Sequence, residues 1–243
     1  MKGNPRTSSF DRRSRSVVAA ILVAAGILAP PFVLSSCGVK PPEIASVEWR
    51  IESRPRPEGS KADNSLNMYE SLSVFGSIKD DAGLDNISEL WIVHDASCLA
   101  WKLTDADWTK TSSGEDIWIG TSALATPELG SLPRGDYRMI AIDAAGARAE
   151  LGFTVAGEFP EKTPPRIAYG NGTLSVHSDW PETLALAFDE AGALITSVAA
   201  PTAASSLSDE FGKDIALRTT EIGAYGYDPT LQMGSFSRRI TTR

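Results

Sequence analysis

The sequence predicts an all-β protein built from two tandem β-sandwich domains. Three observations lead to this fold class: apolar and polar residues alternate in short runs, turn residues separate these runs, and no convincing amphipathic helix occurs between residues 46 and 155. Alternation is typical of a strand with one buried face, whereas an amphipathic helix repeats its apolar residues every three or four positions. Many short strands at regular spacing favour a sandwich.

The first predicted domain covers residues 44–156. Its first strand is indicated by Val47, Trp49 and Ile51, which alternate with charged residues. The strands expected in this domain are residues 46–52, 72–78, 88–95, 99–103, 116–120, 136–142 and 147–155, with a connection over 121–134. Turns of the form Asp-x-Ala-Gly, at 80–83 and 143–146, separate two pairs of these strands.

The second predicted domain covers residues 166–243 and follows a Pro-rich linker at 157–165. It is expected to be a small sandwich of the same kind, because Asn171-Gly172 is a typical hairpin turn and another Asp-x-Ala-Gly turn occurs at 189–192. A short Ser-capped helical turn is predicted at Ser205–Phe211. The strands expected here are residues 166–169, 173–177, 184–188, 194–198, 215–217, 222–227 and 234–240.

Residues 1–36 have the layout of a secretion signal. Four arginines precede an uninterrupted apolar run of 13 residues, Val17–Ala29, which is shorter than the about 20 residues that a membrane-spanning helix needs. The same length argues against the alternative, a short anchor helix with an incidental cysteine. The segment ends in Leu34-Ser35-Ser36-Cys37-Gly38, where small residues precede the cysteine.

Leu34-Ser35-Ser36-Cys37 resembles the lipobox of bacterial lipoproteins. The resemblance implies cleavage before Cys37 and attachment of a diacylglyceryl group to its thiol, with residues 37–43 as a lipidated tether. Two or three acyl chains such as palmitate hold a protein stably on a bilayer. Gly38 occupies the position where an Asp retains many Gram-negative lipoproteins in the inner membrane, so the resemblance implies the outer membrane rather than the inner one.

Two stretches of the first domain, VFGSIKDDAGLDNISELWI (74–92) and LPRGDYRMIAIDAAGARAELGFTV (132–155), resemble the immunoglobulin-like and fibronectin type III-like modules of bacterial surface proteins. The resemblance implies that Tyr137 forms a tyrosine corner, with its hydroxyl bonded to upstream backbone. It also implies that Trp91 is the core tryptophan of a central strand. It says almost nothing about function.

Charge excludes one class of partner. The first 36 residues contain five of the 23 Lys and Arg and one of the 31 Asp and Glu, so the net charge of the remainder is −12 rather than −8. Such an acidic body is repelled by nucleic acid. Once Cys37 is lipidated, Cys98 is the only other cysteine, and it is either buried and inert or reactive. Its apolar surroundings, SCLAWKL, favour burial.

Asp80, Asp81, Asp85 and Asn86 form a candidate calcium site, because a hard cation prefers several oxygen ligands and loops of β-sandwiches often supply them. The alternative is an ordinary turn, in which these side chains bond to their own backbone. Four tryptophans also lie close together in the sequence: Trp91, Trp101, Trp108 and Trp118. Trp101 and Trp108 are candidates for binding a partner. The alternative is packing in the core or between domains.

No motif indicates an enzyme or a cofactor. The sequence lacks a Gly-x-Ser-x-Gly elbow, a phosphate-binding loop and a dinucleotide fingerprint. The two histidines, His94 and His177, form no metal-binding pair and fall on predicted strands. The leading hypothesis is a non-catalytic, membrane-anchored envelope lipoprotein that binds a protein or glycan partner. The alternatives are a structural spacer or accessory of an envelope assembly, and a calcium- or glycan-binding adhesin module.

Overall fold

The computed structural model describes residues 40–57, 67–113 and 116–242 of the chain. The predicted signal segment and Cys37 lie outside these residues. Strands dominate the described part, which confirms the predicted all-β fold class. No helix in these ranges is long and apolar enough to cross a bilayer.

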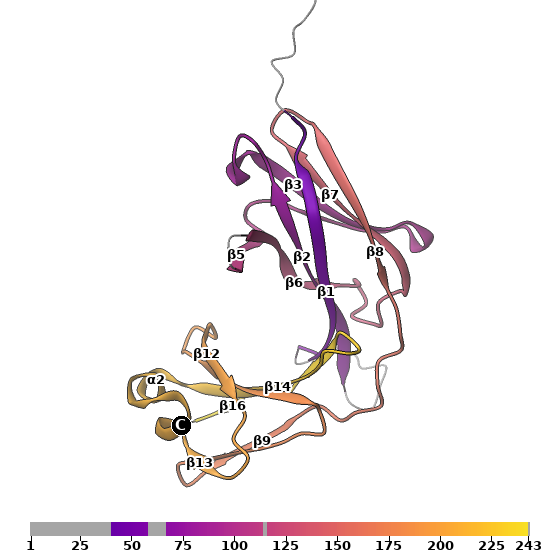
Figure 1. Ribbon diagram of the computed structural model, residues 1–243. Helices are drawn as coiled ribbons and strands as arrows, with labels where there is room; N and C mark the ends of the chain where they lie inside the picture. The colour runs from indigo at the N-terminus through magenta and orange to yellow at the C-terminus, as the bar shows by residue number, and fades with distance from the viewer. Residues whose placement is uncertain (1–39, 58–66, 114–115, 243) are drawn as a thin grey trace, which may run out of the picture. The chain divides into compact units, whose positions relative to one another are not determined.

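The largest sheet has nine strands, and β1 lies in its middle (Figure 1). Its strands, in order across the sheet, are β12 (Leu194–Ala199), β11 (Glu182–Phe188), β14 (Glu221–Asp228), β15 (Met233–Phe236), β1 (Glu43–Pro55), β2 (Met68–Lys79), β6 (Asp116–Ala125) and β5 (Thr109–Ser113), with β16 (Ile240–Thr241) beside β14. The predicted strand at 46–52 is confirmed and extends at both ends. β5 was not predicted, and β6 continues into the predicted 121–134 connection.

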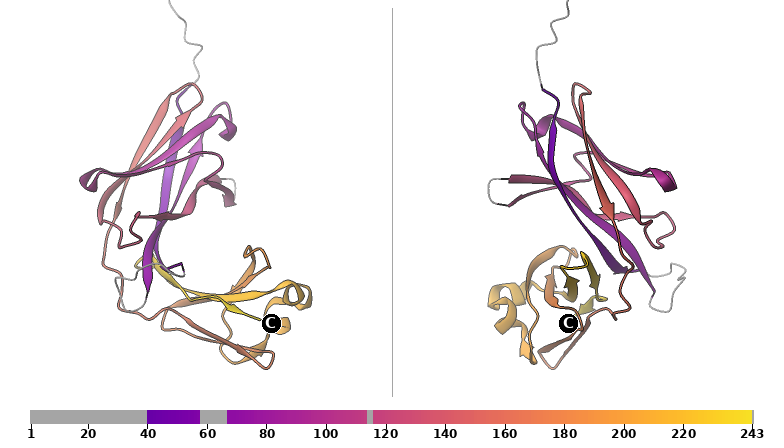
Figure 2. Two further views of the ribbon diagram at one scale, coloured as in Figure 1. Left: turned by 180° about the vertical axis from the view of Figure 1, so that it is seen from behind. Right: turned by 45° about the vertical axis from the view of Figure 1, so that its right-hand side comes forward.

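A four-stranded sheet packs against one face of β1, β2 and β6 and completes a sandwich (Figure 2). Its order is β4 (Leu99–Leu103), β3 (Ile87–His94), β7 (Gly135–Asp143) and β8 (Arg148–Val155). The core between the two layers includes Ile51, Leu72, Val74 and Ile119 from the large sheet and Leu90, Ile92, Tyr137 and Met139 from the small one. Burying each large apolar side chain contributes about 1.5–3 kcal/mol.

A three-stranded sheet and two short helices cover β11 and β14. The sheet contains β13 (Ser205–Ser206), β10 (Thr173–His177) and β9 (Arg166–Gly170), and the helices are α1 (Leu207–Phe211) and α2 (Lys213–Arg218). Their shared core consists of Leu174, Ala185, Ala187, Leu207, Phe211 and Ile222. Ser206 caps α1 by accepting a hydrogen bond from the amide of Asp209, which confirms the predicted Ser-capped turn.

Backbone hydrogen bonds cross the boundary predicted between the two domains. Residues 157–165 form neither helix nor strand, but β15 pairs in parallel with β1 and aligns Met233 with Ile51. One sheet therefore contains strands from both sides of the linker, and Val39–Arg243 forms one compact unit. Independent folding of residues 44–156 and 166–243 stays a prediction.

The three Asp-x-Ala-Gly turns form as expected. In each, the carbonyl of the Asp accepts a hydrogen bond from the amide of the Gly three residues later, at 2.9, 3.0 and 2.9 Å for Asp80, Asp143 and Asp189. The glycines have positive φ angles of 91°, 82° and 75°, a conformation that costs other residues energy. Two 3-10 turns, η1 (Leu84–Asn86) and η2 (Asp95–Ser97), flank β3.

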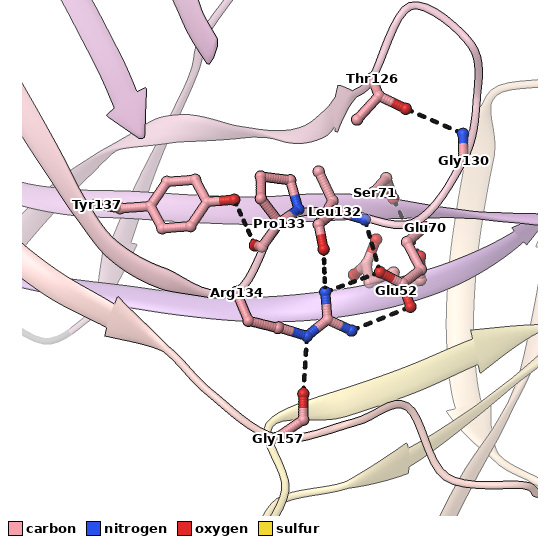
Figure 3. Close-up of polar contacts among 10 residues, drawn as sticks. All are labelled: Glu52, Glu70, Ser71, Thr126, Gly130, Leu132, Pro133, Arg134, Tyr137 and Gly157. Atoms are coloured by element: carbon pink, nitrogen blue, oxygen red, sulfur yellow. Dashed lines mark hydrogen bonds and ion pairs between the residues drawn. The ribbon is translucent and has the colours of Figure 1, made fainter. Parts of the chain in front are cut away.

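Tyr137 makes the backbone contact that was predicted for it (Figure 3). Its side chain is 1% exposed, and its hydroxyl donates a 2.8 Å hydrogen bond to the carbonyl of Pro133. The ring packs against His94 and Phe153, with centroid distances of 4.6 and 5.5 Å. Burial raises the pKa of Tyr137 to about 12.

An ion pair beside Tyr137 fixes the segment that leads into β7 (Figure 3). Arg134 contacts Glu70 through both guanidinium ends, at 2.9 and 3.0 Å, and its Nε donates a 2.7 Å hydrogen bond to the carbonyl of Gly157. The same carboxylate accepts a hydrogen bond from the amide of Leu132. Bidentate pairs of this kind are geometrically specific. The network ties β2 to the start of the predicted linker.

Two predictions about burial are wrong. Trp91 is half-exposed, because Leu90 and Ile92 take the core face of β3 and alternation places Trp91 on the other face. Cys98 is exposed, because it lies in a turn with a φ angle of 54° between η2 and β4, and the apolar run that follows it belongs to β4 alone.

Two strand predictions near the C-terminus also need correction. The predicted strand at 215–217 is part of α2, in which Ile215 packs on the core and Leu217 is 76% exposed. Three apolar residues are too few to distinguish the two periodicities. The predicted strand at 234–240 is two strands, β15 and β16, separated by Ser237–Arg239.

Candidate functional site

A concave site lies on the face of the nine-stranded sheet that points away from the sandwich core. Its volume is about 790 Å³, within the range of about 300–1,000 Å³ that is usual for small-ligand sites. We name it the arginine pocket and define it by the charged and aromatic residues of its lining: Arg50, Glu52, Arg54, Arg56, Tyr69, Phe75, Phe188, Tyr225, Phe236, Arg238 and Arg239.

Strand alternation brings the charged residues of β1 to this pocket. Residues two apart in a strand point to the same side, so Arg50, Glu52 and Arg54 share one face. Ile51 points the opposite way and is fully buried in the sandwich core. The pocket therefore lies on the opposite face of β1 from the sandwich core, and the packing of Ile51 in that core fixes the strand beneath the pocket.

Strand pairing brings the aromatic residues to the same place. β15 aligns Gly234 with Glu52 of β1, and β14 in turn aligns Tyr225 with Phe236 of β15. Phe188, at the end of β11, pairs with the first residue of β14. Residues from segments far apart in the sequence thus line the same pocket.

Three guanidinium groups of the pocket region lie over aromatic rings. The distances from the guanidinium carbon to the ring centroid are 3.6 Å for Arg239 over Phe188, 4.5 Å for Arg54 over Phe236 and 5.5 Å for Arg50 over Tyr227. Each such contact contributes about 0.5–2 kcal/mol. Stacking also limits the motion of the planar group. The cations are therefore held in place before any ligand arrives.

Glu52 is the buried acid of the pocket. It is 4% exposed and forms a 2.5 Å contact between its Oε2 and Nη2 of Arg54. Arg54 also donates to Ser71 Oγ at 2.9 Å and to the carbonyl of Ser122 at 3.0 Å. Burial raises the pKa of Glu52, and the guanidinium groups of Arg54 and Arg50 partly offset this rise. The ion pair thus offsets only part of the cost of burying Glu52.

Tyr225 brings a second buried polar group to the pocket. The residue is 6% exposed, and its ring lies 4.4 Å from that of Phe236. Burial raises the pKa of its hydroxyl well above the usual range, and nearby Arg50 lowers it only in part. Among the described residues no group makes a hydrogen bond of good geometry to this hydroxyl, although the Arg50 guanidinium lies close to it. Such a group is costly unless something bonds to it.

Gly234 makes room for the Tyr225 hydroxyl. A Cβ atom at Gly234 would lie 2.3 Å from that oxygen, so no larger residue fits without displacing the ring. The backbone of β15 therefore forms the floor under Tyr225.

Sequence reasoning did not single out the residues of the pocket. The alternation of the first strand predicts exposure for Arg50 and Glu52, yet the structure buries Glu52. One signal was present: Arg50, Glu52 and Arg54 put opposite charges side by side on one strand face.

The predicted tryptophan sites lie elsewhere. Trp108 is buried in the sandwich core. Trp101 is half-buried against the same core and donates a 3.0 Å hydrogen bond from its indole nitrogen to the carbonyl of Ala125. Neither lines the arginine pocket. Their role in binding stays a prediction.

The acidic residues of the predicted calcium site contact other groups of the protein. Asp80 accepts hydrogen bonds from the amide of Ala82 at 2.7 Å and from the side-chain amide of Asn86 at 3.2 Å. Asp85 pairs with Lys110 at 2.5 Å, and Asp81 lies 3.7 Å from Lys40. Within the ranges that the structure describes, no three His, Cys, Asp or Glu side chains are grouped to hold a metal ion.

Comparisons with known proteins give distant similarities only. No family model matches the chain, and no curated protein matches it. Tp47, the 47-kilodalton lipoprotein of Treponema pallidum, is 12% identical with a TM-score of 0.35, over 76% of this chain and 47% of that one. Dimeric latent PorU from Porphyromonas gingivalis is 15% identical with a TM-score of 0.32, over 83% and 20%. The chain thus spans less than half the length of either protein.

Proposed function

We propose that this chain is a non-catalytic lipoprotein of the cell envelope that binds a protein or glycan partner in the arginine pocket. Acyl chains on Cys37 hold it on a membrane, and the lipobox-like Leu34–Cys37 supports this anchor. Gly38 supports the outer membrane over the inner one. The sandwich is proposed to be immunoglobulin-like or fibronectin type III-like, and the hydrogen bond from Tyr137 to Pro133 supports this.

The observation that carries the binding role is the charge of the pocket. The region after residue 36 has a net charge of −12, yet among the described residues the pocket lining contains five arginines and one acid, Glu52. A local positive site on an acidic body attracts an anionic group while the rest of the surface repels it. The β strands beneath the site supply a rigid scaffold.

The contacts of the pocket favour binding over catalysis. One oxygen of Glu52 is occupied by Arg54, and neither histidine lines the pocket. His94 contacts Ser97 Oγ at 2.7 Å and the carbonyl of Arg134 at 3.3 Å. A catalytic site needs a nucleophile or base within reach of a reacting group, and the described contacts assign no side chain to that role.

The membrane anchor predicts selective lipid labelling. Growth with a clickable palmitate should label the wild-type protein and the Cys98→Ala variant equally, whereas Cys37→Ala should be unlabelled and retain its first 36 residues. The cause is that only the Cys37 thiol meets the lipidation enzyme. Gel fluorescence and intact mass measure the two effects. Equal labelling of Cys37→Ala and wild type would reject the anchor.

The binding role predicts a partner close to β12. A diazirine-bearing amino acid in place of Ser197, which lines the pocket, should form an adduct when intact cells are illuminated. Diazirines insert into both proteins and glycans, so the readout does not depend on the class of partner. The control places the same amino acid at Arg148, an exposed residue of β8 that does not line the pocket. Adducts at neither site, or equal adducts at both, would favour the structural spacer instead.

A further inference from the structure

We infer that the arginine pocket takes a carboxylated sugar, such as a uronic acid unit of an anionic glycan. This inference rests on the proposed function and narrows the partner to one chemical class. Such a ring presents three kinds of group at once: a carboxylate, several hydroxyls and an apolar C–H face. The pocket offers a counterpart to each.

Arginines supply the counterpart for the carboxylate. Arg50 and Arg238 line the pocket. Arg50 lies near Tyr225 and Glu52, but among the described residues the carboxylate of Glu52 pairs with Arg54 and that of Glu221 with Arg239. The planar guanidinium donates two parallel hydrogen bonds to a carboxylate. Arg50 is stacked over Tyr227 and is therefore partly preorganised for this contact.

Buried polar groups supply the counterpart for the hydroxyls. The Tyr225 hydroxyl is buried in the pocket lining beside the Arg50 guanidinium and makes no hydrogen bond of good geometry, so a ligand hydroxyl that enters beside Arg50 would satisfy it. The Glu52 carboxylate lies on the same face of the sheet and accepts hydrogen bonds. A simple inorganic anion would be attracted by the arginines but repelled by Glu52. A ligand with both an acid and hydroxyls avoids this conflict.

Aromatic side chains supply the counterpart for the C–H face. Tyr69 and Phe75 project from β2 on the pocket side of the sheet, and both are half-buried. The partly exposed rings can pack against the apolar face of a sugar.

The position of the pocket disfavours an acidic peptide. An extended peptide is usually held by main-chain hydrogen bonds to an exposed strand edge. Most of the pocket lies instead over β11, β14, β15, β1 and β2, each of which is paired with a strand on both sides, and the edge strand β12 contributes Leu194 and Ser197 at one end. The main-chain groups of these central strands are already used in sheet pairing, so recognition over them depends on side chains.

Calorimetric titration of the full-length protein in mild detergent tests the inference. The probes are an oligogalacturonate and an oligoglucuronate, each compared with its methyl ester, which removes the charge and keeps the ring. The acids should bind and the esters should not. Arg50→Gln should weaken binding by about 10- to 100-fold, the value of a lost charge-assisted hydrogen bond. Arg148→Gln on β8 is the matched control and should bind as the wild type does.

A second variant distinguishes a loss of binding from a loss of folding. Arg238 is exposed, so Arg238→Gln should leave the near-UV spectrum unchanged and weaken binding by about two- to fivefold. Equal binding of acids and esters, no binding of either acid, or binding of polyglutamate alone would each overturn the inference. If a Ser197 adduct still formed in cells after such a result, the proposed binding role would stand with a different partner.

Discussion

Replacing Tyr137 with Ala is expected to lower the free energy of unfolding by about 3–5 kcal/mol, the range for removing a buried aromatic side chain. The ring is 1% exposed and packs between His94 and Phe153 in the sandwich. Its loss leaves a cavity that a rigid pair of sheets cannot close. Equilibrium denaturant melts of the full chain, followed by circular dichroism, measure the change.

Tyr137→Phe is the matched comparison, because it keeps the ring and removes only the hydroxyl. It is expected to cost about 1–3 kcal/mol, since the carbonyl of Pro133 loses its 2.8 Å hydrogen bond. If both variants unfolded at the wild-type denaturant concentration, Tyr137 would not have the structural role that its contacts indicate.

Gly120→Ala is expected to destabilise the protein by about 3 kcal/mol, the upper part of the range for overpacking. A Cβ atom at Gly120 would lie 2.0 Å from the carbonyl oxygen of Val74 and 2.7 Å from the Cα of Phe75. Both obstacles belong to the backbone of β2, so the paired strands β2 and β6 would have to separate. The same denaturant melts measure the effect.

Gly170→Ala on β9 is the control for this substitution. An added Cβ at Gly170 meets nothing within 4 Å, so the change should be nearly neutral. If both substitutions lowered the free energy of unfolding by a similar amount, the close approach of the β2 backbone would not be the reason that position 120 requires glycine.

Local features of the sequence predicted most of the strands. β4 and β10 have the predicted bounds, and the three Asp-x-Ala-Gly turns form where their residues occur. These features depend on neighbours in the chain: alternation sets which side chains share a face, and glycine permits the positive φ of the turn. Tyr137 was also found in this way, since its hydrogen bond reaches back only to Pro133.

The errors arose where local pattern was short or ambiguous. Cys98 adjoins an apolar strand but lies in the turn before it, and Ile215–Leu217 is too brief to separate strand from helix. Trp91 was placed in the core by resemblance, whereas Leu90 and Ile92 take the core face. In each case the choice of face or conformation depended on packing partners elsewhere in the chain.

By itself the sequence determined the all-β class, most strand positions, the turns and the lipobox-like segment, because each of these is encoded over a few consecutive residues. Only the tertiary structure decided the arginine pocket. In the sequence, Arg50 and Glu52 belong to the polar face of a half-exposed strand. No feature of the residues around Tyr225 or Phe236 indicates that these two aromatic residues lie beside that strand. Parallel pairing of β1 with β15 joins these residues, and such pairing between distant segments depends on backbone hydrogen bonds and buried area that no short stretch of sequence specifies.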